Sequence, residues 1–487
     1  MRNPEDYIAS VQDGREVYYM GKRVGDIASH PSLRIPLHHA KRMYELRSDP
    51  AYRDMLVYED ERFGLISSFF KVPKREQDLV ERAETIGALT RACNGIFNIT
   101  QAIGSDALFA LMIITKRLEK EHGKGEYHER LMNYYERVVT RDLALATAQM
   151  DVKGDRSKRP HEQPDPDLYL RVVEVNEGGI VVCGAKAHTT QSVVADELFF
   201  IPSRAMTEKD QDYCVAFAIP ANAKGLKFIV RPLLEVDGYA EKEDAPLSSS
   251  NLEAETLTVL DHVFVPWDRV FLFKEWRIAG ELANLFATYH RYTAVSYRSV
   301  LVDLYLGAAR LAAACNGIEN APHVRDDILD IVLYKEIMRM ATRMAAMTAV
   351  RDPETGILVP NPIYTNIGKL YSNAFFPVVI ENLIDIAGGL VSTLPSTAEL
   401  KNPATRPYVE KFMQGSPRFS GLERFKVMRF VRELAGGPLT GYLLGAMIHA
   451  EGSVAASKIA LYRDYDFAEA ERLARKVAGL SEKERAS

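Results

Sequence analysis

The stretch from Glu281 to Ala314, ELANLFATYHRYTAVSYRSVLVDLYLGAARLAAA, constrains the fold of this chain more than any other. It contains no proline, and its first glycine is Gly307. Its apolar residues recur at intervals of three and four, which is the spacing of one face of a helix. The stretch therefore predicts one long helix.

A polar pair interrupts the apolar pattern of this predicted helix. On a period of 3.6 residues, His290, Ala294 and Tyr297 share one stripe, with Phe286 one turn before and Leu301 one turn after. An imidazole and a phenol buried among apolar neighbours need hydrogen-bond partners. Two interpretations stay open: a core histidine that bonds to a neighbouring carbonyl, or a histidine that lines a functional pocket.

Length and charge exclude several classes of protein. With 487 residues, the chain predicts two or three packed units. Its 61 basic and 66 acidic residues give a net charge of -5, which does not favour nucleic acid as a partner. No apolar run approaches the roughly 20 residues that span a bilayer, and the opening MRNPEDYIAS lacks an apolar signal core. We therefore expect a cytoplasmic protein. Its cysteines form no CxxC pair and are expected to be reduced: Cys93, Cys183, Cys214 and Cys315.

The order of patterns along the chain predicts an α+β multidomain fold. A short hairpin precedes a helical region that ends near Met150, where the segment DVKGDRSKRPHEQPDPD marks a boundary. Alternating runs linked by turns then predict a mainly antiparallel sheet, a small sandwich or barrel, from about Pro166 to Phe273. Helices follow to the end. The predicted domains are a mainly helical N-terminal domain at 1–150, a central β-domain at 151–274 and a C-terminal helical bundle at 275–487.

Common catalytic motifs are missing from the sequence. It has no GxGxxG after a strand, no GxxxxGK[ST], no GxSxG and no HExxH. Besides the His290 helix, three stretches carry polar or glycine-rich groups: GAKAHTTQS at 184–192, MDVKGDRS at 150–157 and IAGGLVSTLPS at 386–396. Paired glycines at a helix end let backbone N–H groups approach an anion, although they also end ordinary helices.

These stretches together resemble a known family. DYIASVQDGREVYYMGKRVGDIASHP, GAKAHTTQS, DHVFVPWDRVFL, YHR and DIAGGLVSTLPS are similar, in this order, to segments of the flavoproteins that join 4-hydroxybutyryl-CoA dehydratase to 4-hydroxyphenylacetate 3-hydroxylase. The resemblance covers nearly the whole chain. It implies an acyl-CoA dehydrogenase-like fold, bound FAD and a homotetramer built on the C-terminal bundle.

The resemblance also implies which residues contact FAD. Hydroxyl and amide groups suit the edge of a flavin ring, and positive charge or free N–H groups suit its diphosphate. The implied contacts are Gln149, Met150, Asp151, Lys153, Arg156, Lys186, His188, Thr189, Thr190 and Gln191, with Gly388 and Gly389 from a neighbouring subunit.

The sequence departs from the dehydratase at its iron–sulfur site. The dehydratase holds a [4Fe-4S] cluster with three cysteines and a histidine, and the matching positions here are Leu89, Cys93, His290 and Tyr297. Leucine cannot bind iron and four ligands are usual, so we expect no metal. A tyrosine and a lysine of the dehydratase become Ala294 and Arg298, and its C-terminal glutamate falls at Ala446, with Glu451 nearby.

The sequence departs from the hydroxylase as well. The segment that holds the phenol in the hydroxylase reads GIFNIT here, at 95–100, and the hydroxylase's histidine falls near Thr147. However, PLSSSNLEAETLTVLDHVFVPWDRV matches that branch well.

The resulting hypothesis is an FAD-dependent oxidoreductase that acts on an acyl-CoA or related carboxylic substrate by dehydrogenation, isomerisation or dehydration. Its candidate catalytic residues are His290, Tyr297, Arg298 and Glu451, with His290 first and Glu451 second as the base. One alternative is a two-component monooxygenase supplied by a separate flavin reductase. Another is a catalytically silent flavin-binding paralogue, since fold alone does not define function.

Overall fold

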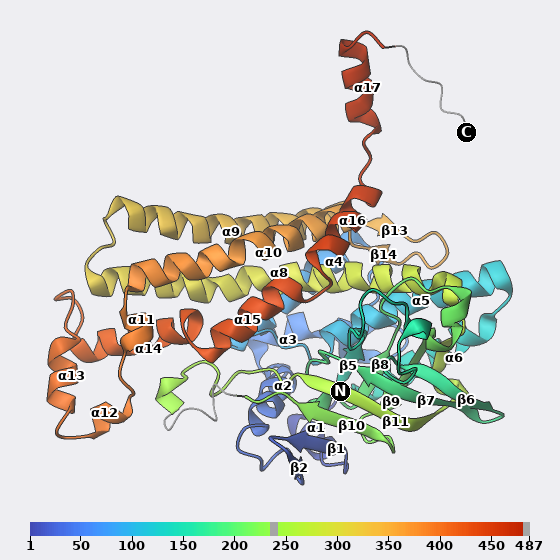
Figure 1. Cartoon of the computed structure of the whole chain (residues 1–487), viewed down its shortest axis with the longest axis horizontal. Helices are drawn as coiled ribbons and strands as arrows, with labels where there is room; N and C mark the ends of the chain where they lie inside the picture. The colour runs from blue at the N-terminus through green and yellow to red at the C-terminus, as the bar shows by residue number, and fades with distance from the viewer. Residues whose placement is uncertain (234–241, 481–487) are drawn as a thin grey trace.

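The computed structural model of the chain describes residues 1–233 and 242–480 (Figure 1). The N-terminal part is mainly helical. Its elements are α1 (Pro4–Ser10), α2 (Arg34–Leu46), α3 (Pro50–Leu56), the hairpin β3 (Val57–Asp60) and β4 (Gly64–Ser67), η1 (Ser68–Phe70), α4 (Glu76–Ala92), α5 (Ala102–His122) and α6 (Gly125–Arg141).

Two sheets form the centre of the molecule. The six-stranded sheet has the order β2-β1-β10-β11-β7-β6, and the four-stranded sheet has the order β12-β9-β8-β5. The strands are β1 (Glu16–Tyr19), β2 (Lys22–Val24), β5 (Leu145–Ala148), β6 (Arg171–Asn176), β7 (Gly179–Lys186), β8 (Glu197–Phe200), β9 (Val215–Pro220), β10 (Leu226–Val230), β11 (Thr256–Pro266) and β12 (Val270–Phe273). Five 3-10 turns accompany them: η2 (Pro160–Glu162), η3 (Ser192–Val194), η4 (Glu208–Tyr213), η5 (Lys242–Asp244) and η6 (Trp267–Arg269).

The sheets are mainly antiparallel, as the sequence predicts. Two pairs are parallel, β1 with β10 and β5 with β8. Strands β1, β2 and β5 come from the first 150 residues, yet they complete the two sheets. The N-terminal hairpin is therefore part of the central sheet as well as a lead into the first helices.

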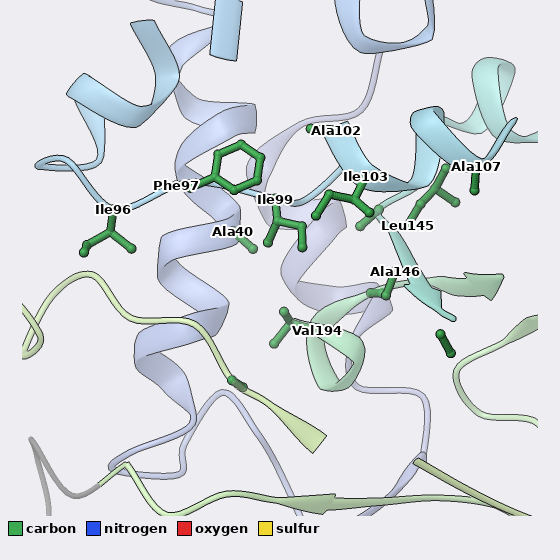
Figure 2. Close-up of a cluster of buried hydrophobic side chains, with 14 of the residues drawn as sticks. Ala40, Ile96, Phe97, Ile99, Ala102, Ile103, Ala107, Leu145, Ala146 and Val194 are labelled. Atoms are coloured by element: carbon green, nitrogen blue, oxygen red, sulfur yellow. The ribbon is translucent and has the colours of Figure 1, made fainter. Parts of the chain in front are cut away.

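The hydrophobic core joins the N-terminal helices to the four-stranded sheet. Helix α5 is buried on every side from Ala102 to Thr115, which is typical of a helix enclosed by other elements. Figure 2 shows Ala40 of α2, Ile99 just before α5 and Ile103 in the first turn of α5 in one cluster with Leu145 of β5. Ile99 and Ile103 also form part of the wall of the main cavity.

Three long helices form the C-terminal bundle and lie side by side in Figure 1: α8 (Trp276–Asn316), α9 (Pro322–Met347) and α10 (Pro362–Ala387). Helix α8 contains the whole predicted stretch and confirms it as one helix. The proline-rich segment between α9 and α10 forms the hairpin of β13 (Val350–Arg351) and β14 (Leu358–Val359). The remaining helices are α11 (Leu390–Thr393), α12 (Ala398–Lys401), α13 (Arg406–Phe412), α14 (Gly421–Ala435), α15 (Pro438–His449), α16 (Val454–Asp464) and α17 (Ala468–Val477).

Helix α17 projects away from the body of the molecule (Figure 1). Among the described residues, none of the helices is both long and apolar enough to span a membrane.

Candidate active site

A cavity of about 480 Å³ lies where the three parts of the chain meet. Its wall draws on the start of α5, on β5 and the loop after it, on the loop after β7, on α8 and on the C-terminal end of α15. It is lined by Ile99, Ile103, Thr147, Gln149, Met150, His188, Thr190, Glu255, Phe286, His290, Gly441, Tyr442, Gly445, Ala446, His449, Ala450, Glu451 and Gly452.

His290 contributes an imidazole from α8 to this wall. Its ring stacks on Phe286, one helical turn earlier, with the ring centroids 5.4 Å apart. Its Nδ1 atom is buried and has no hydrogen-bond partner within the described part of the chain. Burial lowers the pKa of His290 and outweighs the opposite effect of the Glu451 and Asp106 carboxylates. The imidazole is therefore neutral near pH 7, with one nitrogen available to a ligand.

Glu451 lies next to His290 in the lining and is held by two cations. It follows α15 with a φ of +56°, which turns its side chain into the protein. Arg298 Nη2 donates to Glu451 Oε2 at 2.6 Å, and Lys369 Nζ lies 3.6 Å from the same oxygen. Burial raises the pKa of Glu451, but Arg298 and Lys369 more than offset this, and the pKa falls below its usual value. Glu451 is therefore a carboxylate that is already paired.

Lys369 is the weaker partner of this carboxylate. It is fully buried on α10, and burial lowers its pKa to about 8 although Glu451 acts in the opposite direction. Arg298 is also fully buried, and the carboxylate raises its pKa further above the usual range. Arg298 thus carries the permanent charge of the cluster, and it pairs with a carboxylate of the protein.

Tyr297 lies outside the main cavity. Its ring stacks on Phe97, with centroids 4.5 Å apart and an interplanar angle of 7°. Both rings line a second, smaller cavity of about 30 Å³, whose lining shares Tyr442 and Ala446 with the main one. Within the described part of the chain, no hydrogen bond joins Tyr297 to His290.

Four of the predicted flavin contacts reach the cavity: Gln149, Met150, His188 and Thr190. The loop after β7 brings the last two there by an unusual backbone path. His188 and Gln191 have φ values of +56° and +59°, a region that non-glycine residues enter at a cost in strain. Such strain at a cavity wall is typical of functional loops.

Three other predicted contacts hold this loop in place from behind the wall. Lys186 donates to Gln149 O, to Asp151 Oδ1 and to Ile201 O at 2.9, 2.7 and 3.2 Å, so all three of its ammonium protons are used within the chain. Gln191 accepts from Ala254 N at 3.1 Å and donates to Pro36 O at 3.3 Å. Lys186, Asp151 and Gln191 therefore support the loop.

Thr189 is buried beside these residues and has an unused hydroxyl. Its backbone N–H donates to Thr256 O at 3.2 Å, while its Oγ1 has no partner among the described residues. An unsatisfied buried hydroxyl is costly, which makes Thr189 a candidate contact for a bound group.

Positive charge gathers at one side of the cavity. His449 lines it, and the pKa of His449 is lowered by burial and by Lys153, His188, Lys369 and Arg156, all of which are cationic or can become so. Lys153 and Arg156 belong to the predicted flavin contacts. Because these side chains are close to one another, they favour an anionic group such as a diphosphate.

The predicted glycine contacts lie far from this cavity. Gly388 and Gly389 follow α10 and are exposed, and Gly388 has a φ of +69°. The end of α10 is fixed by Asn316, whose Nδ2 donates to Ile386 O at 3.0 Å. Asn316 lies 26 residues after His290 on α8, or about 40 Å along the helix axis. Gly388 and Gly389 are therefore too far from the cavity of their own chain to line it, and their contact with a neighbouring subunit stays a prediction.

The residues at the cluster positions of the dehydratase do not fit an iron–sulfur cluster. Leu89 is buried in the core, and Tyr297 stacks on Phe97. Cys93 keeps the family position, and burial raises the pKa of its thiol to about 12. In the described ranges, no group of three His, Cys, Asp or Glu side chains is placed to hold a metal ion.

Sequence reasoning missed several residues of the lining, above all Glu255, Tyr442 and His449. The Tyr442 hydroxyl lies 3.0 Å from Glu255 Oε1, although the two residues are 187 positions apart. A local pattern carries no signal for such a contact. Gly441 and Gly445 did offer a signal, because their spacing of four puts both on one helix face, where they leave space for the cavity.

Comparisons with known proteins cover nearly the whole chain. The family model described as 4-hydroxyphenylacetate 3-hydroxylase N terminal matches residues 3–272, and that described as 4-hydroxyphenylacetate 3-hydroxylase C terminal matches residues 279–479. The chain is 32% identical to 4-hydroxybutyryl-CoA dehydratase/vinylacetyl-CoA-Delta-isomerase of Clostridium aminobutyricum over 98% of its own length and 99% of that protein. It is 30% identical to the 4-hydroxyphenylacetate 3-monooxygenase oxygenase component of Thermus thermophilus, with 82% and 81% covered.

Solved structures lead to the same two groups of proteins. An oxygen-tolerant archaeal 4-hydroxybutyryl-CoA dehydratase from N. maritimus superimposes with a TM-score of 0.93 at 28% identity, covering 99% of this chain and 96% of that one. The oxygenase component of 4-hydroxyphenylacetate 3-monooxygenase, complexed with FAD and 4-hydroxyphenylacetate, gives 0.91 at 27% identity, with 98% of both chains covered. The chain belongs to the 4-hydroxyphenylacetate 3-hydroxylase family of flavin-dependent enzymes, which includes both the oxygenase components and the dehydratase.

Proposed function

We propose that this protein is an FAD-dependent oxidoreductase that acts on an acyl-CoA or related carboxylic substrate by dehydrogenation, isomerisation or dehydration. The observation that carries the proposal is the His290 Nδ1 atom, which has no hydrogen-bond partner among the described residues and lies in a mostly apolar cavity beside the loops predicted to contact flavin. The match to the dehydratase over the full length of both proteins supports the substrate class.

The residues of the cavity fit a flavin. Thr190 and Gln149 offer hydroxyl and amide groups at its wall, Thr189 offers an unsatisfied hydroxyl, and Lys153 and Arg156 offer positive charge for a diphosphate. The chemistry that FAD supplies when bound is the acceptance of two electrons.

His290 is the proposed proton-transfer residue. A neutral imidazole with a free nitrogen can take the acidified proton from the carbon next to a thioester or carboxylate carbonyl. Glu451 is less suited to this step, because Arg298 and Lys369 stabilise its charged form and make it a weaker base. The proposed role of Glu451 is to neutralise the positive charge of Arg298 and Lys369 next to His290. We propose no step through an iron–sulfur cluster, because Leu89 has no atom that can bind iron and the Tyr297 ring is stacked on Phe97.

A second candidate function is that of a two-component monooxygenase, with a separate reductase that supplies reduced flavin. The identity of 30% to an oxygenase component favours it. The cavity wall weighs against a phenol substrate, because the segment that holds the phenol in the hydroxylase is here GIFNIT and presents Ile99 to the cavity.

An absorption spectrum of the purified protein, recorded with and without acyl-CoA esters, tests the proposal. We expect a flavin spectrum that an acyl-CoA ester perturbs or bleaches. A flavin spectrum that responds only to a 4-hydroxyphenyl compound, with hydroxylation in the presence of a flavin reductase, would favour the monooxygenase. Flavin binding without turnover of any substrate in either panel would favour the silent paralogue.

A further inference from the structure

Two carboxyl groups meet at the boundary between the two cavities. Glu255 lines the main cavity, and Glu253 lines the smaller one. Tyr442 lines both, and its hydroxyl oxygen lies 3.0 Å from Glu255 Oε1 and 3.3 Å from Glu253 Oε2. Thr190 Oγ1 also donates to Glu255 Oε1, at 2.7 Å. Four side chains thus form one continuous line of contacts from Glu253 to Thr190.

Counting the hydrogen atoms available for these contacts shows which of the two carboxyl groups is protonated. The Tyr442 hydroxyl has one hydrogen and cannot donate it to both carboxyl groups. Burial raises the pKa of Glu255 as well, but its Oε1 accepts hydrogen bonds from both Thr190 and Tyr442, which favours the charged form of Glu255 over that of Glu253. The contact between Tyr442 and Glu253 then needs a hydrogen from Glu253, so Glu253 is the protonated member.

The charged groups around the pair agree with this assignment. Glu253 faces Glu255 and Tyr442, Arg231 at the end of β10, and Tyr297 and Cys93 from α8 and α4. Burial, followed by the repulsion of Glu255, raises the pKa of Glu253 to about 8. Arg231 acts in the opposite direction and stacks over the Tyr442 ring at 4.0 Å. Among the described residues, Arg231 is the cation that acts on both carboxyl groups, which suits a pair that carries a single negative charge.

Each of the two carboxyl groups in this line has one oxygen without a partner among the described residues. Glu255 Oε2 and Glu253 Oε1 are both buried, and neither has a hydrogen-bond partner among the residues that the structure describes. Glu255 Oε2 can therefore accept a contact from a ligand in the main cavity. A core carboxylate with only a structural role would have both oxygens satisfied.

We propose that Glu253 and Glu255 form a proton-sharing pair, bridged by Tyr442, that stores one proton and delivers it to the main cavity beside Thr190. In the transfer, Glu253 gives its proton to the Tyr442 oxygen while the Tyr442 hydroxyl gives its own to Glu255. Glu253 ends as a carboxylate and Glu255 as a carboxylic acid, so the net charge of the pair does not change. Delivery to a substrate rests on the proposed function, whereas storage is a property of the protein alone.

Infrared difference spectroscopy of the full-length protein, titrated from pH 6 to pH 10, tests the storage. We expect the carbonyl band of one protonated carboxyl group that disappears with a midpoint of about 8. Glu253→Gln should abolish this band, while the control Glu174→Gln, which changes an exposed carboxylate on β6, should retain it. Absence of the band at pH 7 in the unchanged protein, or its survival in Glu253→Gln, would overturn the proposal.

A second variant keeps the test open if Glu253→Gln does not fold. Tyr442→Phe retains both carboxyl groups and removes only the bridging hydroxyl. Because the Tyr442 oxygen lies 3.3 Å from Glu253 Oε2, loss of the hydroxyl should shift the midpoint of the Glu253 titration. An unchanged midpoint would overturn the bridge.

Turnover measurements separate storage from delivery. If the pair supplies a proton, turnover should fall as the pH rises above about 8. In Glu253→Gln, this fall in the pH profile of turnover should be absent. A fall in turnover above pH 8 that persists in Glu253→Gln would overturn the proposal that the pair delivers a proton to the cavity. Failure of the acyl-CoA hypothesis has a different signature, because acyl-CoA esters would then have no effect while the infrared band is still present.

Discussion

Two histidines of this chain, His290 and His39, lie in apolar surroundings but differ in how their ring nitrogens are used. His39 Nε2 lies 3.0 Å from Phe97 O and its Nδ1 lies 3.5 Å from Asn251 Oδ1, so both nitrogens have partners. His290 Nδ1 has none among the described residues. His39 therefore behaves as a core histidine whose ring nitrogens are both bonded, which was one of the two interpretations of His290. His290 instead lines the cavity.

The substitution His290→Gln distinguishes the two roles. We expect the variant to retain its flavin and its assembly while turnover falls by ~10²-fold or more, the usual effect of losing a general acid or base. Turnover, flavin content and melting temperature should be measured on one preparation. His39→Gln is the matched control, and it should lower the melting temperature but not turnover per folded protein. Full activity in His290→Gln would assign His290 to the core.

Arg298 supports a second prediction. Arg298→Met removes the strongest partner of the buried Glu451 carboxylate and should lower the free energy of unfolding by ~3–5 kcal/mol at pH 7. The folded pKa of Glu451 is lowered, so this stabilisation is present above the unfolded pKa near 4.5 and is lost as pH falls through the folded pKa. The difference in the free energy of unfolding between the unchanged protein and Arg298→Met should therefore shrink below pH 4.5. Urea unfolding at pH 7 and pH 4 measures it, and an equal difference at both pH values would contradict the ion pair.

At the scale of elements, glycines show where helices approach their neighbours and where they leave space. A Cβ atom on Gly104 of α5 would lie 2.2 Å from Leu145 Cβ on β5, too close for any real contact. A Cβ atom on Gly445 of α15 would meet nothing within 4 Å, although Gly445 lines the main cavity. Gly104 thus allows close packing, and Gly445 keeps the cavity open.

Alanine substitutions at these two glycines should therefore have opposite effects. Gly104→Ala should reduce the free energy of unfolding by ~1–3 kcal/mol, because overpacking outweighs the better helix propensity of alanine. Gly445→Ala should raise it by up to ~1 kcal/mol and weaken flavin or substrate binding by placing a methyl group in the cavity. Chemical unfolding and a flavin titration of both variants provide the test. Tight binding by Gly445→Ala would show that this part of the cavity is not used.

At the scale of the whole molecule, an apolar stripe on α9 is left uncovered. Leu329, Leu333, Met340 and Met347 are 56%, 54%, 58% and 53% exposed, and their spacing places them on one face of the helix. Several exposed apolar side chains on one helix face are typical of an interface between proteins. It agrees with the predicted homotetramer, in which Gly388 and Gly389 would contact the flavin of a neighbouring subunit.

Light scattering tests this assembly. We expect a tetramer for the unchanged protein and smaller species for Leu333→Glu, because the new charge would be buried at the interface. Leu65→Glu is the control, since Leu65 is a similarly exposed leucine on β4, at 49%. A stable flavin-bound monomer of the unchanged protein would refute the prediction.

The metal content of the protein is also a property of the whole molecule. Because Leu89 and Tyr297 occupy two of the four ligand positions of the dehydratase, we expect flavin without iron after anaerobic purification. Removal of metal by a chelator should then leave the absorption spectrum and turnover unchanged. About four irons per chain would contradict this expectation.

Several features of the protein follow from the sequence alone. The stretch Glu281–Ala314 forms part of a single helix of 41 residues because its apolar spacing and its lack of proline act locally. The mainly antiparallel sheets follow for the same reason, since alternation and turn residues are local signals. The family was recognisable because its segments occur in order along the chain.

Only the tertiary structure decided which of these elements meet. It pairs β1 with β10, brings Glu451 to Arg298 over 153 positions, and brings Tyr442 to Glu255 over 187. It also places Tyr297 against Phe97, away from His290 on the same helical stripe. The physical reason is that periodicity identifies the buried face of an element but not the face that covers it, which depends on how distant elements pack.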